Sequence, residues 1–124
     1  MDPARVRASV ESFVAAWNEH DTPKRTRLIE EACTEDVVLI TGARRIEGRI
    51  QLDAFIANFQ QRRPHDRAVF TSPIDVQGSI FRYTGKVEGQ AGGAAMDVGE
   101  CDGNGKIRLL LTFVGATLAG SIAP

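Results

Sequence analysis

The sequence predicts an α+β fold in which helices come first and an antiparallel sheet follows them. Three stretches before residue 64 place apolar residues at spacings of three and four, which is typical of amphipathic helices. After residue 68, short runs rich in β-branched and aromatic residues alternate with glycine-bearing turns, which is typical of a β-meander. A chain of 124 residues has the length of one domain, so we expect a single domain over 1–124. We expect residues 116–124 to form a loosely ordered tail.

The first predicted helix spans residues 3–19. Its apolar stripe consists of Val6, Val10, Phe13, Val14 and Trp17. A second helix begins at Asp21 or Thr22, because Pro23 suits the first helical turn. Its apolar side consists of Leu28, Ile29, Ala32 and Cys33. The third helix covers about residues 50–62 and ends before Pro64, and its apolar side consists of Leu52, Phe55, Ile56 and Phe59.

Two short strands are predicted before the third helix, at 37–40 and 46–48. The runs that read as strands after it are 69–71, 74–76, 80–87, 94–101 and 107–114. Gly78-Ser79 suits a two-residue hairpin with glycine first, and the glycines at 103 and 105 suit another turn.

The last predicted strand is apolar on both faces, because Leu109, Leu110 and Leu111 follow one another before Phe113 and Val114. A strand with one solvent-exposed face alternates apolar and polar residues, so this pattern predicts that both faces are covered. The helices cover one face. The other is covered either by a second copy of the chain, which makes a homodimer through the sheet face, or by the 116–124 tail.

Composition excludes several classes of function. Fifteen basic and 16 acidic side chains give a net charge of −1, so a nucleic-acid footprint is not indicated. No apolar stretch is long enough to span a bilayer, and no secretory leader is recognisable, so we expect a cytoplasmic protein. Cys33 and Cys101 show no metal-ligand spacing and read as free buried thiols. We expect no metal and no cofactor.

Asp97 is the most informative single residue, because aspartate is depleted from strands and is costly to bury unpaired. If its side chain points inward, it marks a ligand site and its pKa is raised by desolvation. The alternative places Asp97 in solvent, with Met96 and Val98 facing the core instead. The period-two pattern alone leaves both readings open.

The order of elements and five local motifs together resemble the SnoaL-like and ketosteroid-isomerase-like proteins of the nuclear transport factor two-like superfamily. The motifs are Ala16–Asp21, Glu35–Val38, Glu47–Arg49, Met96–Val98 and Asp102–Ile107. The resemblance implies a cone, in which a curved sheet in the order α-α-β-β-α-β-β-β-β packs on three helices around an apolar cavity at the open end. It also implies homodimers and a small hydrophobic ligand, and the enzymes of this group include isomerases, polyketide cyclases, dehydratases and epoxide hydrolases.

In ketosteroid isomerases an aspartate equivalent to Asp97 is kept neutral and donates a hydrogen bond to a forming oxyanion. This chain departs from that pattern at two positions, because Phe13 replaces the oxyanion tyrosine and Thr41 falls at the place of the catalytic base. The acids that the cyclases and epoxide hydrolases carry late in the chain have no counterpart between 109 and 119. The resemblance therefore predicts the fold more firmly than the activity.

Arg82 lies on the strand expected beside Asp97, and an inward Arg82 would pair with the carboxylate and keep it ionised. The alternative places Phe81 and Tyr83 inside and Arg82 on the surface. We take Asp97 as the candidate proton-handling group and Arg82 as its electrostatic partner. The candidate substrate-binding residues are Phe13, Trp17, Thr41, Phe55, Phe59, Thr84 and Leu110.

Two functions follow from these observations. The first is binding of a small apolar or polyketide-like molecule with cofactor-free isomerisation, cyclisation or dehydration. The second is a ligand-binding or dimerisation module without catalysis, and the loss of the tyrosine and the base favours it. The state of the cavity separates them: a cavity open to Asp97 favours chemistry, and a filled one favours the module.

Overall fold

The computed structural model describes residues 2–89 and 93–115, so the predicted tail at 116–124 lies outside the described residues. The helices are α1 (Pro3–Asn18), α2 (Thr22–Ala32) and α3 (Gly48–Arg62). The strands are β1 (Cys33–Thr41), β2 (Arg44–Glu47), β3 (Arg67–Phe70), β4 (Asp75–Gln77), β5 (Ile80–Glu88), β6 (Ala94–Cys101) and β7 (Ile107–Val114). The predicted α+β class and order of elements are confirmed, with the short β4 paired only to β5.

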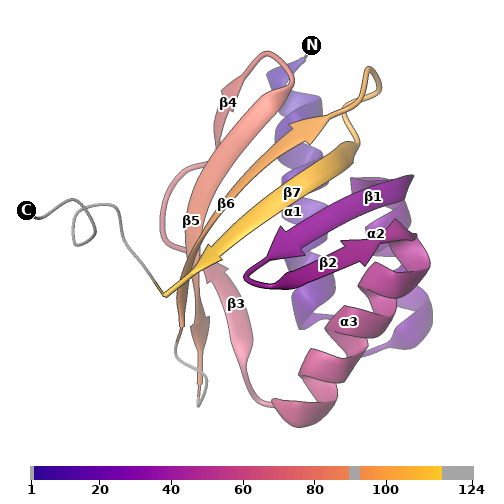
Figure 1. Cartoon of the computed structure of the whole chain (residues 1–124), viewed down its shortest axis with the longest axis vertical. Helices are drawn as coiled ribbons and strands as arrows, with labels where there is room; N and C mark the ends of the chain where they lie inside the picture. The colour runs from indigo at the N-terminus through magenta and orange to yellow at the C-terminus, as the bar shows by residue number, and fades with distance from the viewer. Residues whose placement is uncertain (1, 90–92, 116–124) are drawn as a thin grey trace, which may run out of the picture.

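The strands form one curved, open sheet in the order β2-β1-β7-β6-β5-β3 (Figure 1). Neighbouring strands run antiparallel except β1 and β7, which are parallel, so the sheet is mixed rather than wholly antiparallel. The parallel pair joins the first strand to the last. Parallel strands cannot be joined by a tight turn, and here the rest of the sheet and α3 lie between them in the sequence. Helix α1 runs behind the sheet in this view, and α3 lies beside β1 and β2.

Side chains that the sequence places at the helix ends fix the start of α1 and α2. The Asp2 carboxylate accepts a hydrogen bond from the backbone N–H of Ala4 at 2.9 Å, and Asp21 accepts from the N–H of Lys24 at 3.1 Å. Where α1 ends, the amide of Asn18 donates to the carbonyl of Ala68 and accepts from its N–H, at 2.9 and 2.8 Å. This pair of bonds joins the end of α1 to β3.

The periodicity predicted that Cys33 belongs to the second helix. In the structure Cys33 instead begins β1. The helix ends at Ala32, and the backbone is extended at Cys33 with φ −126° and ψ 151°. Cys33 and Cys101 are both free and buried, and both pair with Ile107 from opposite sides of β7. Two strand spacings separate them by about 10 Å, which is beyond disulfide reach. Burial raises the pKa of Cys33 to about 12 and of Cys101 to about 11, so neither is a reactive thiol.

The core lies between the three helices and the concave face of the sheet. Its fully buried members include Val6, Val10, Ile29, Leu52, Ile56, Ile107 and Leu110. Gly99 on β6 is required by packing, because a Cβ atom there would collide with the Phe81 ring and the carbonyl oxygen of Leu109. Among the helices of the described residues, none combines the length and the apolar content that crossing a membrane requires.

Candidate functional site

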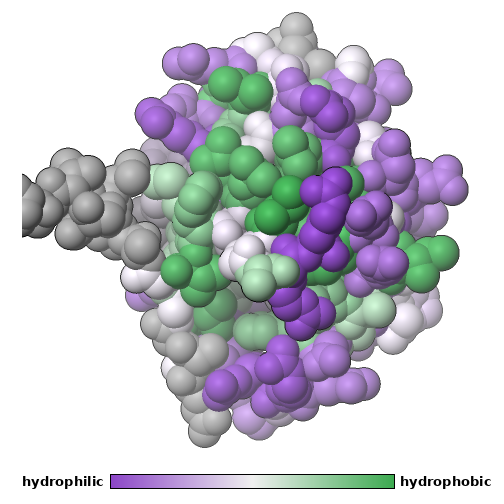
Figure 2. Space-filling model, in the orientation of Figure 1, coloured by the Kyte–Doolittle hydropathy of each residue, from purple (hydrophilic) through white to green (hydrophobic). Residues whose placement is uncertain are grey.

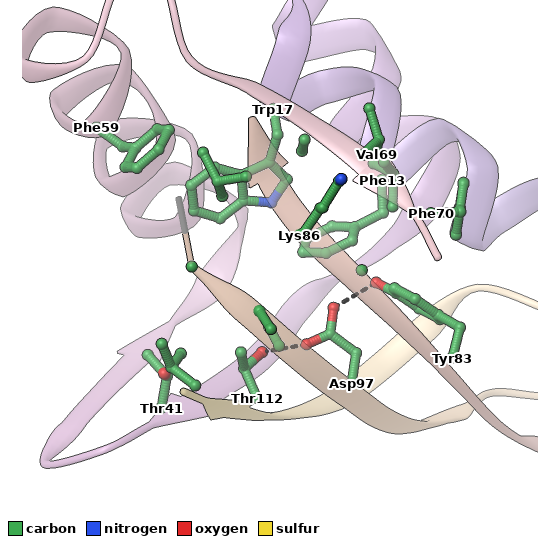
Figure 3. Close-up of a pocket in the computed structure, with 18 of the residues that line it drawn as sticks. Phe13, Trp17, Thr41, Phe59, Val69, Phe70, Tyr83, Lys86, Asp97 and Thr112 are labelled. Carbon is green, nitrogen blue, oxygen red and sulfur yellow. Dashed lines mark hydrogen bonds between the residues drawn. The ribbon is translucent and has the colours of Figure 1, made fainter. Parts of the chain in front are cut away.

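A cavity of about 330 Å³ lies between the helices and the concave face of the sheet (Figure 3). Its walls are mostly apolar, and its aromatic residues are Phe13, Trp17, Phe55, Phe59, Phe70 and Tyr83. The volume falls at the small end of ordinary ligand sites. It is about twice that of an engineered cavity that takes one benzene ring, which is about 150 Å³. The space therefore suits a compound of about two rings.

Trp17 is the centre of the aromatic wall. Its ring packs edge-on against Phe13, Phe55 and Phe59, with centroid distances of 6.4, 5.9 and 5.3 Å. Edge-to-face pairs of this kind stabilise beyond the area that they bury. The wall is thus a packed cluster from α1 and α3 and not a set of free rotors.

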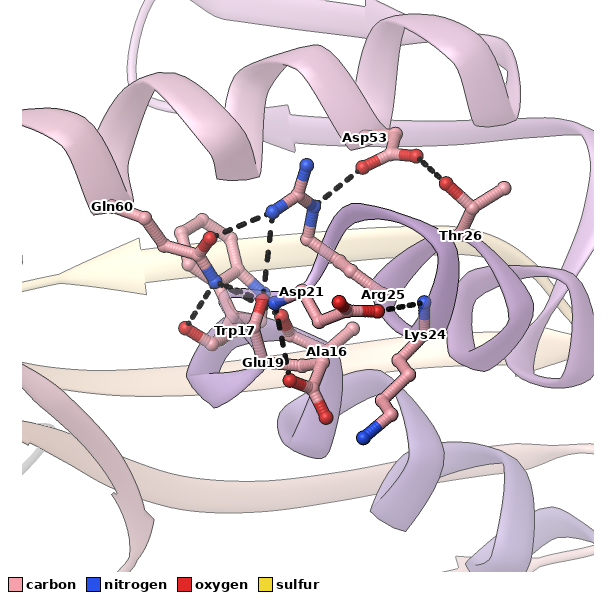
Figure 4. A network of polar contacts seen from close by, with 9 residues as sticks. All are labelled: Ala16, Trp17, Glu19, Asp21, Lys24, Arg25, Thr26, Asp53 and Gln60. Atoms are coloured by element: carbon pink, nitrogen blue, oxygen red, sulfur yellow. Dashed lines mark hydrogen bonds and ion pairs between the residues drawn. The ribbon is translucent and has the colours of Figure 1, made fainter.

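A buried polar network holds the end of α1 that carries Trp17 (Figure 4). The amide nitrogen of Gln60 donates to the carbonyls of Ala16, Trp17 and Glu19 at 3.2, 3.0 and 2.9 Å. Arg25 donates to the Gln60 oxygen at 2.9 Å and forms an ion pair with Asp53 at 2.7 Å. These bonds satisfy carbonyls that a helix end leaves without partners, so α1, α2 and α3 are fixed together beside the cavity.

Asp97 lies in the cavity lining, and both of its carboxyl oxygens accept hydrogen bonds from hydroxyl groups. Tyr83 donates to Oδ2 through a short contact, and Thr112 donates to Oδ1 at 2.7 Å. Tyr83, Asp97 and Thr112 are directly opposite one another on β5, β6 and β7. Directly opposed residues of neighbouring strands share a face of the sheet, so the register itself assembles the group.

Desolvation by burial raises the pKa of Asp97 above its ordinary value, and the hydrogen bonds from Tyr83 and Thr112 offset part of this effect. Burial also raises the pKa of Tyr83 well above its usual range, and the adjacent Asp97 carboxyl adds to the rise. Tyr83 therefore keeps its proton at neutral pH and remains a hydrogen-bond donor. Asp97 is the group of this pair that can change protonation state.

The structure brings most of the predicted binding residues together. The predicted site residues that line the cavity with Asp97 are Phe13, Trp17, Thr41, Phe55 and Phe59. The side chain of Asp97 therefore points into the cavity and not into solvent, which settles the choice that the strand pattern left open.

Three predicted site residues lie elsewhere. Arg82 is on the outer face of the sheet, where its Nε bonds Asp75 at 2.9 Å and two thirds of its side chain is exposed, so the expected pair with Asp97 is not formed. Thr84 also faces outward, and its hydroxyl accepts from that of Thr71 at 2.9 Å. Both lie beside the inward-facing Tyr83, and neighbours along a strand point to opposite faces. Leu110 points inward but is packed in the core, 1% exposed, and does not line the cavity.

Sequence reasoning missed Thr112 and did not assign Tyr83 to Asp97. The signal for both is the strand register, because Tyr83 and Thr112 are the cross-strand partners of Asp97. A sequence gives this register only if both turns and the irregularity between Glu100 and Cys101 are known.

The arrangement suits chemistry that moves one proton. No group of three or more histidine, cysteine, aspartate or glutamate side chains in residues 2–89 and 93–115 is arranged to hold a metal ion. Asp97 supplies a carboxyl group of raised pKa, and Tyr83 supplies a hydroxyl bonded to it. A ligand with one oxygen atom near this pair would meet both a proton donor and a proton acceptor.

No protein-family model matches the sequence, and no curated protein matches it. The fold, by contrast, is shared by many solved structures. A candidate isomerase of the SnoaL-like family from Agrobacterium tumefaciens superposes with a TM-score of 0.81 at 23% identity, over 91% of this chain and 99% of that one. A candidate SnoaL-like polyketide cyclase from Jannaschia gives 0.68 at 16% identity, over 95% and 94%. An LEH-like epoxide hydrolase from M. tuberculosis gives 0.68 at 19%, over 90% and 83%. The chain therefore has the SnoaL-like, NTF2-like fold.

Proposed function

We propose that this protein binds a small, mostly apolar molecule in the cavity and that Asp97 handles a proton in it. The observation that carries the proposal is a single carboxyl group, bonded by two hydroxyls, in a cavity whose other lining residues are apolar or uncharged except Lys86. An ionised carboxyl group is costly to bury in such surroundings, and carboxyl groups with perturbed pKa values cluster at functional sites. The isomerase, cyclase and epoxide hydrolase descriptions of structures with the same fold support a small-molecule site.

If the site is catalytic, we propose cofactor-free acid–base chemistry of the isomerase, cyclase or dehydratase type. The Asp97 carboxylate would take a proton from the carbon between a ligand carbonyl and a C=C bond. The electron pair of that C–H bond would form a new C=C bond to the carbonyl carbon, and the π pair of the carbonyl would move to its oxygen. The Asp97 carboxyl would then return the proton to the far carbon of the original C=C bond as the carbonyl re-forms, and the Tyr83 hydroxyl would hold the Asp97 oxygen in place. Arg82 has no part in this scheme, because its guanidinium is bonded to Asp75 on the other face.

The test is exchange of the α-hydrogens of 2-tetralone in D₂O, followed by proton NMR. This ketone has two rings and enolisable hydrogens, which match the cavity volume and the proposed step. We expect the protein to accelerate exchange and Asp97→Asn to lose about 10²-fold or more of that acceleration. Binding, read from the fluorescence of Trp17, should change much less.

The matched control is Asp75→Asn, which removes an exposed carboxylate on the outer face and should leave exchange unchanged. If Asp97→Asn exchanges the ketone as fast as the unchanged protein, the proton-handling role is wrong. Binding of 2-tetralone without any acceleration of exchange would favour the second candidate, a ligand-binding module without catalysis.

We also propose that the protein forms a homodimer through the outer face of the sheet. Asp97 and Thr112 face the cavity, so their strand neighbours Met96, Leu111 and Phe113 face outward. Figure 2 shows hydrophobic residues gathered on this face over β6 and β7. Phe113 is 56% exposed there, and contiguous apolar patches at a surface mark interaction sites.

We place the protein in a reducing compartment such as the cytoplasm. Cys33 and Cys101 are free, buried and too far apart to pair, which is the usual state of cysteine where thiols are kept reduced.

A further inference from the structure

A second hollow lies behind the aromatic wall of the cavity, between β2 and α3. We call it the arginine groove. The side chains that matter for its chemistry are Arg44, Arg45, Gln51, Phe55, Asn58 and Arg62. Among the described residues, no acidic one lines it. It is thus a concave site whose ionisable side chains are all cationic.

The charge in the groove is only partly balanced. Arg45 pairs with Glu47 at 3.0 Å, with both side chains more than half exposed. Within residues 2–89 and 93–115, neither Arg44 nor Arg62 forms an ion pair. Guanidinium groups that share a hollow without carboxylates repel one another, and an anion placed among them relieves that repulsion.

The two amide side chains of the groove are oriented as donors. The oxygen of Gln51 accepts from the backbone N–H of Glu47 at 3.1 Å, and the oxygen of Asn58 accepts from Nε of Arg62 at 2.9 Å. Both of those partners can only donate, so each amide must present its oxygen to them. The NH₂ group of each amide then remains available to donate to a ligand. The amides and the guanidinium groups together offer the groove N–H donors only, which is what an oxyanion requires.

The groove and the cavity meet at one side chain. The Phe55 ring lines both, and it packs edge-on against Trp17 at 5.9 Å on the cavity side. The guanidinium carbon of Arg44 lies 5.0 Å from the centroid of the same ring. A guanidinium held over an aromatic face keeps its edge N–H groups free for a carboxylate, sulfonate or phosphate.

We propose that the arginine groove binds the anionic group of an aromatic ligand whose apolar part occupies the cavity beyond Phe55. The inference rests on the proposed function, because it assumes that the cavity takes a ligand, and it narrows the ligand to an amphipathic oxyanion. The apolar body is recognised by the aromatic wall, and the oxyanion by Arg44, Arg62 and the two amides.

The test compares two fluorescent probes that share one skeleton, 8-anilinonaphthalene-1-sulfonate and uncharged 1-anilinonaphthalene. We expect the unchanged protein to bind the sulfonate more tightly, with an affinity that falls as salt is added. The double variant Arg44→Gln/Arg62→Gln should lose about 10-fold or more of the sulfonate affinity and keep its affinity for the neutral probe. Both arginines are exposed and form no ion pair in the described chain, so the variant should fold normally.

The matched control is Arg7→Gln/Arg27→Gln, which removes the same charge from exposed positions on α1 and α2. An equal loss of sulfonate affinity in this control, or no loss in the groove variant, would overturn the proposed anion site. Equal affinity of the unchanged protein for the two probes would also overturn it. If neither probe binds, the cavity proposal fails with it, whereas binding of the neutral probe alone leaves the cavity proposal standing.

Discussion

At the scale of single residues, the neighbour of Asp97 decides what this carboxyl group can do. An arginine partner would hold the carboxylate ionised at all ordinary pH values, whereas the hydroxyls of Tyr83 and Thr112 only reduce the effect of burial. The raised pKa brings the titration of Asp97 closer to neutral pH. A group in that range can both take and return a proton, which a salt-bridged carboxylate does poorly.

Removing the Tyr83 hydroxyl should raise the pKa of Asp97 further. In Tyr83→Phe the carboxylate loses a hydrogen bond that favours its charged form, while the ring and the burial remain. Thr112→Val should act in the same direction and less strongly, because the hydrogen bond from Tyr83 lowers this pKa more than the bond from Thr112 does. The measurement is the carboxyl-carbon NMR titration of Asp97 in each variant.

Thr84→Val is the control for this prediction, since it removes a hydroxyl from the same strand but from the outer face. The pKa of Asp97 should not move in it. An unchanged or lower pKa in Tyr83→Phe would mean that the Tyr83 bond does not stabilise the carboxylate.

At the scale of elements, the sequence predicted the helices and the last three strands well, because their signals are local, but it predicted only residues 37–40 of β1. The apolar spacing located α1 and α3, and the bounds of β6 and β7 agree with the predicted runs. Local patterns failed where tertiary contacts decide. Cys33 is apolar and fits the period of α2, yet pairing with Ile107 places it in β1. The positions of Tyr83 and Thr112 beside Asp97 depend on a three-strand register that no single segment encodes.

The network at the end of α1 makes a testable claim about how elements are joined. In Gln60→Leu, the carbonyls of Ala16, Trp17 and Glu19 lose the Gln60 donor, and Arg25 loses an acceptor. The Ala16 and Glu19 carbonyls keep bonds from the Glu19 N–H and from Arg25, so the main loss is at the Trp17 carbonyl. We expect a loss of about 1–3 kcal/mol of unfolding free energy. Urea denaturation followed by the fluorescence of Trp17, the single tryptophan of the chain, measures it.

Gln61→Leu is the matched control, because the neighbouring side chain is exposed and its replacement should change stability by less than about 0.5 kcal/mol. The folded Gln60→Leu protein should also show altered Trp17 emission, since the backbone that carries the ring has lost its anchor. Equal stability of the two variants would contradict the structural role of the network.

At the scale of the whole molecule, the curvature of the sheet gives its two faces different tasks. The concave face holds Asp97 and the cavity, while the other carries the half-buried Met96 and Leu111 and the exposed Phe113. A stable interface of standard size buries about 1,600 Å² in total, and a two-fold dimer requires a self-complementary patch.

The proposed dimer should dissociate when a charge replaces the exposed Phe113 on that face. We expect sedimentation to give a dimer for the unchanged protein and a monomer for Phe113→Lys, because the lysine would have to be buried opposite its own copy. Ile50→Lys is the control, since Ile50 is 88% exposed on α3 and should leave the dimer intact. If Phe113→Lys still sediments as a dimer, the dimer uses another surface and the proposed interface is wrong. If the unchanged protein sediments as a monomer, the homodimer proposal is wrong and the apolar outer face is left for a different partner. Because Phe113 and the cavity-lining Thr112 are adjacent on β7, dissociation would also reveal whether ligand binding depends on the dimer.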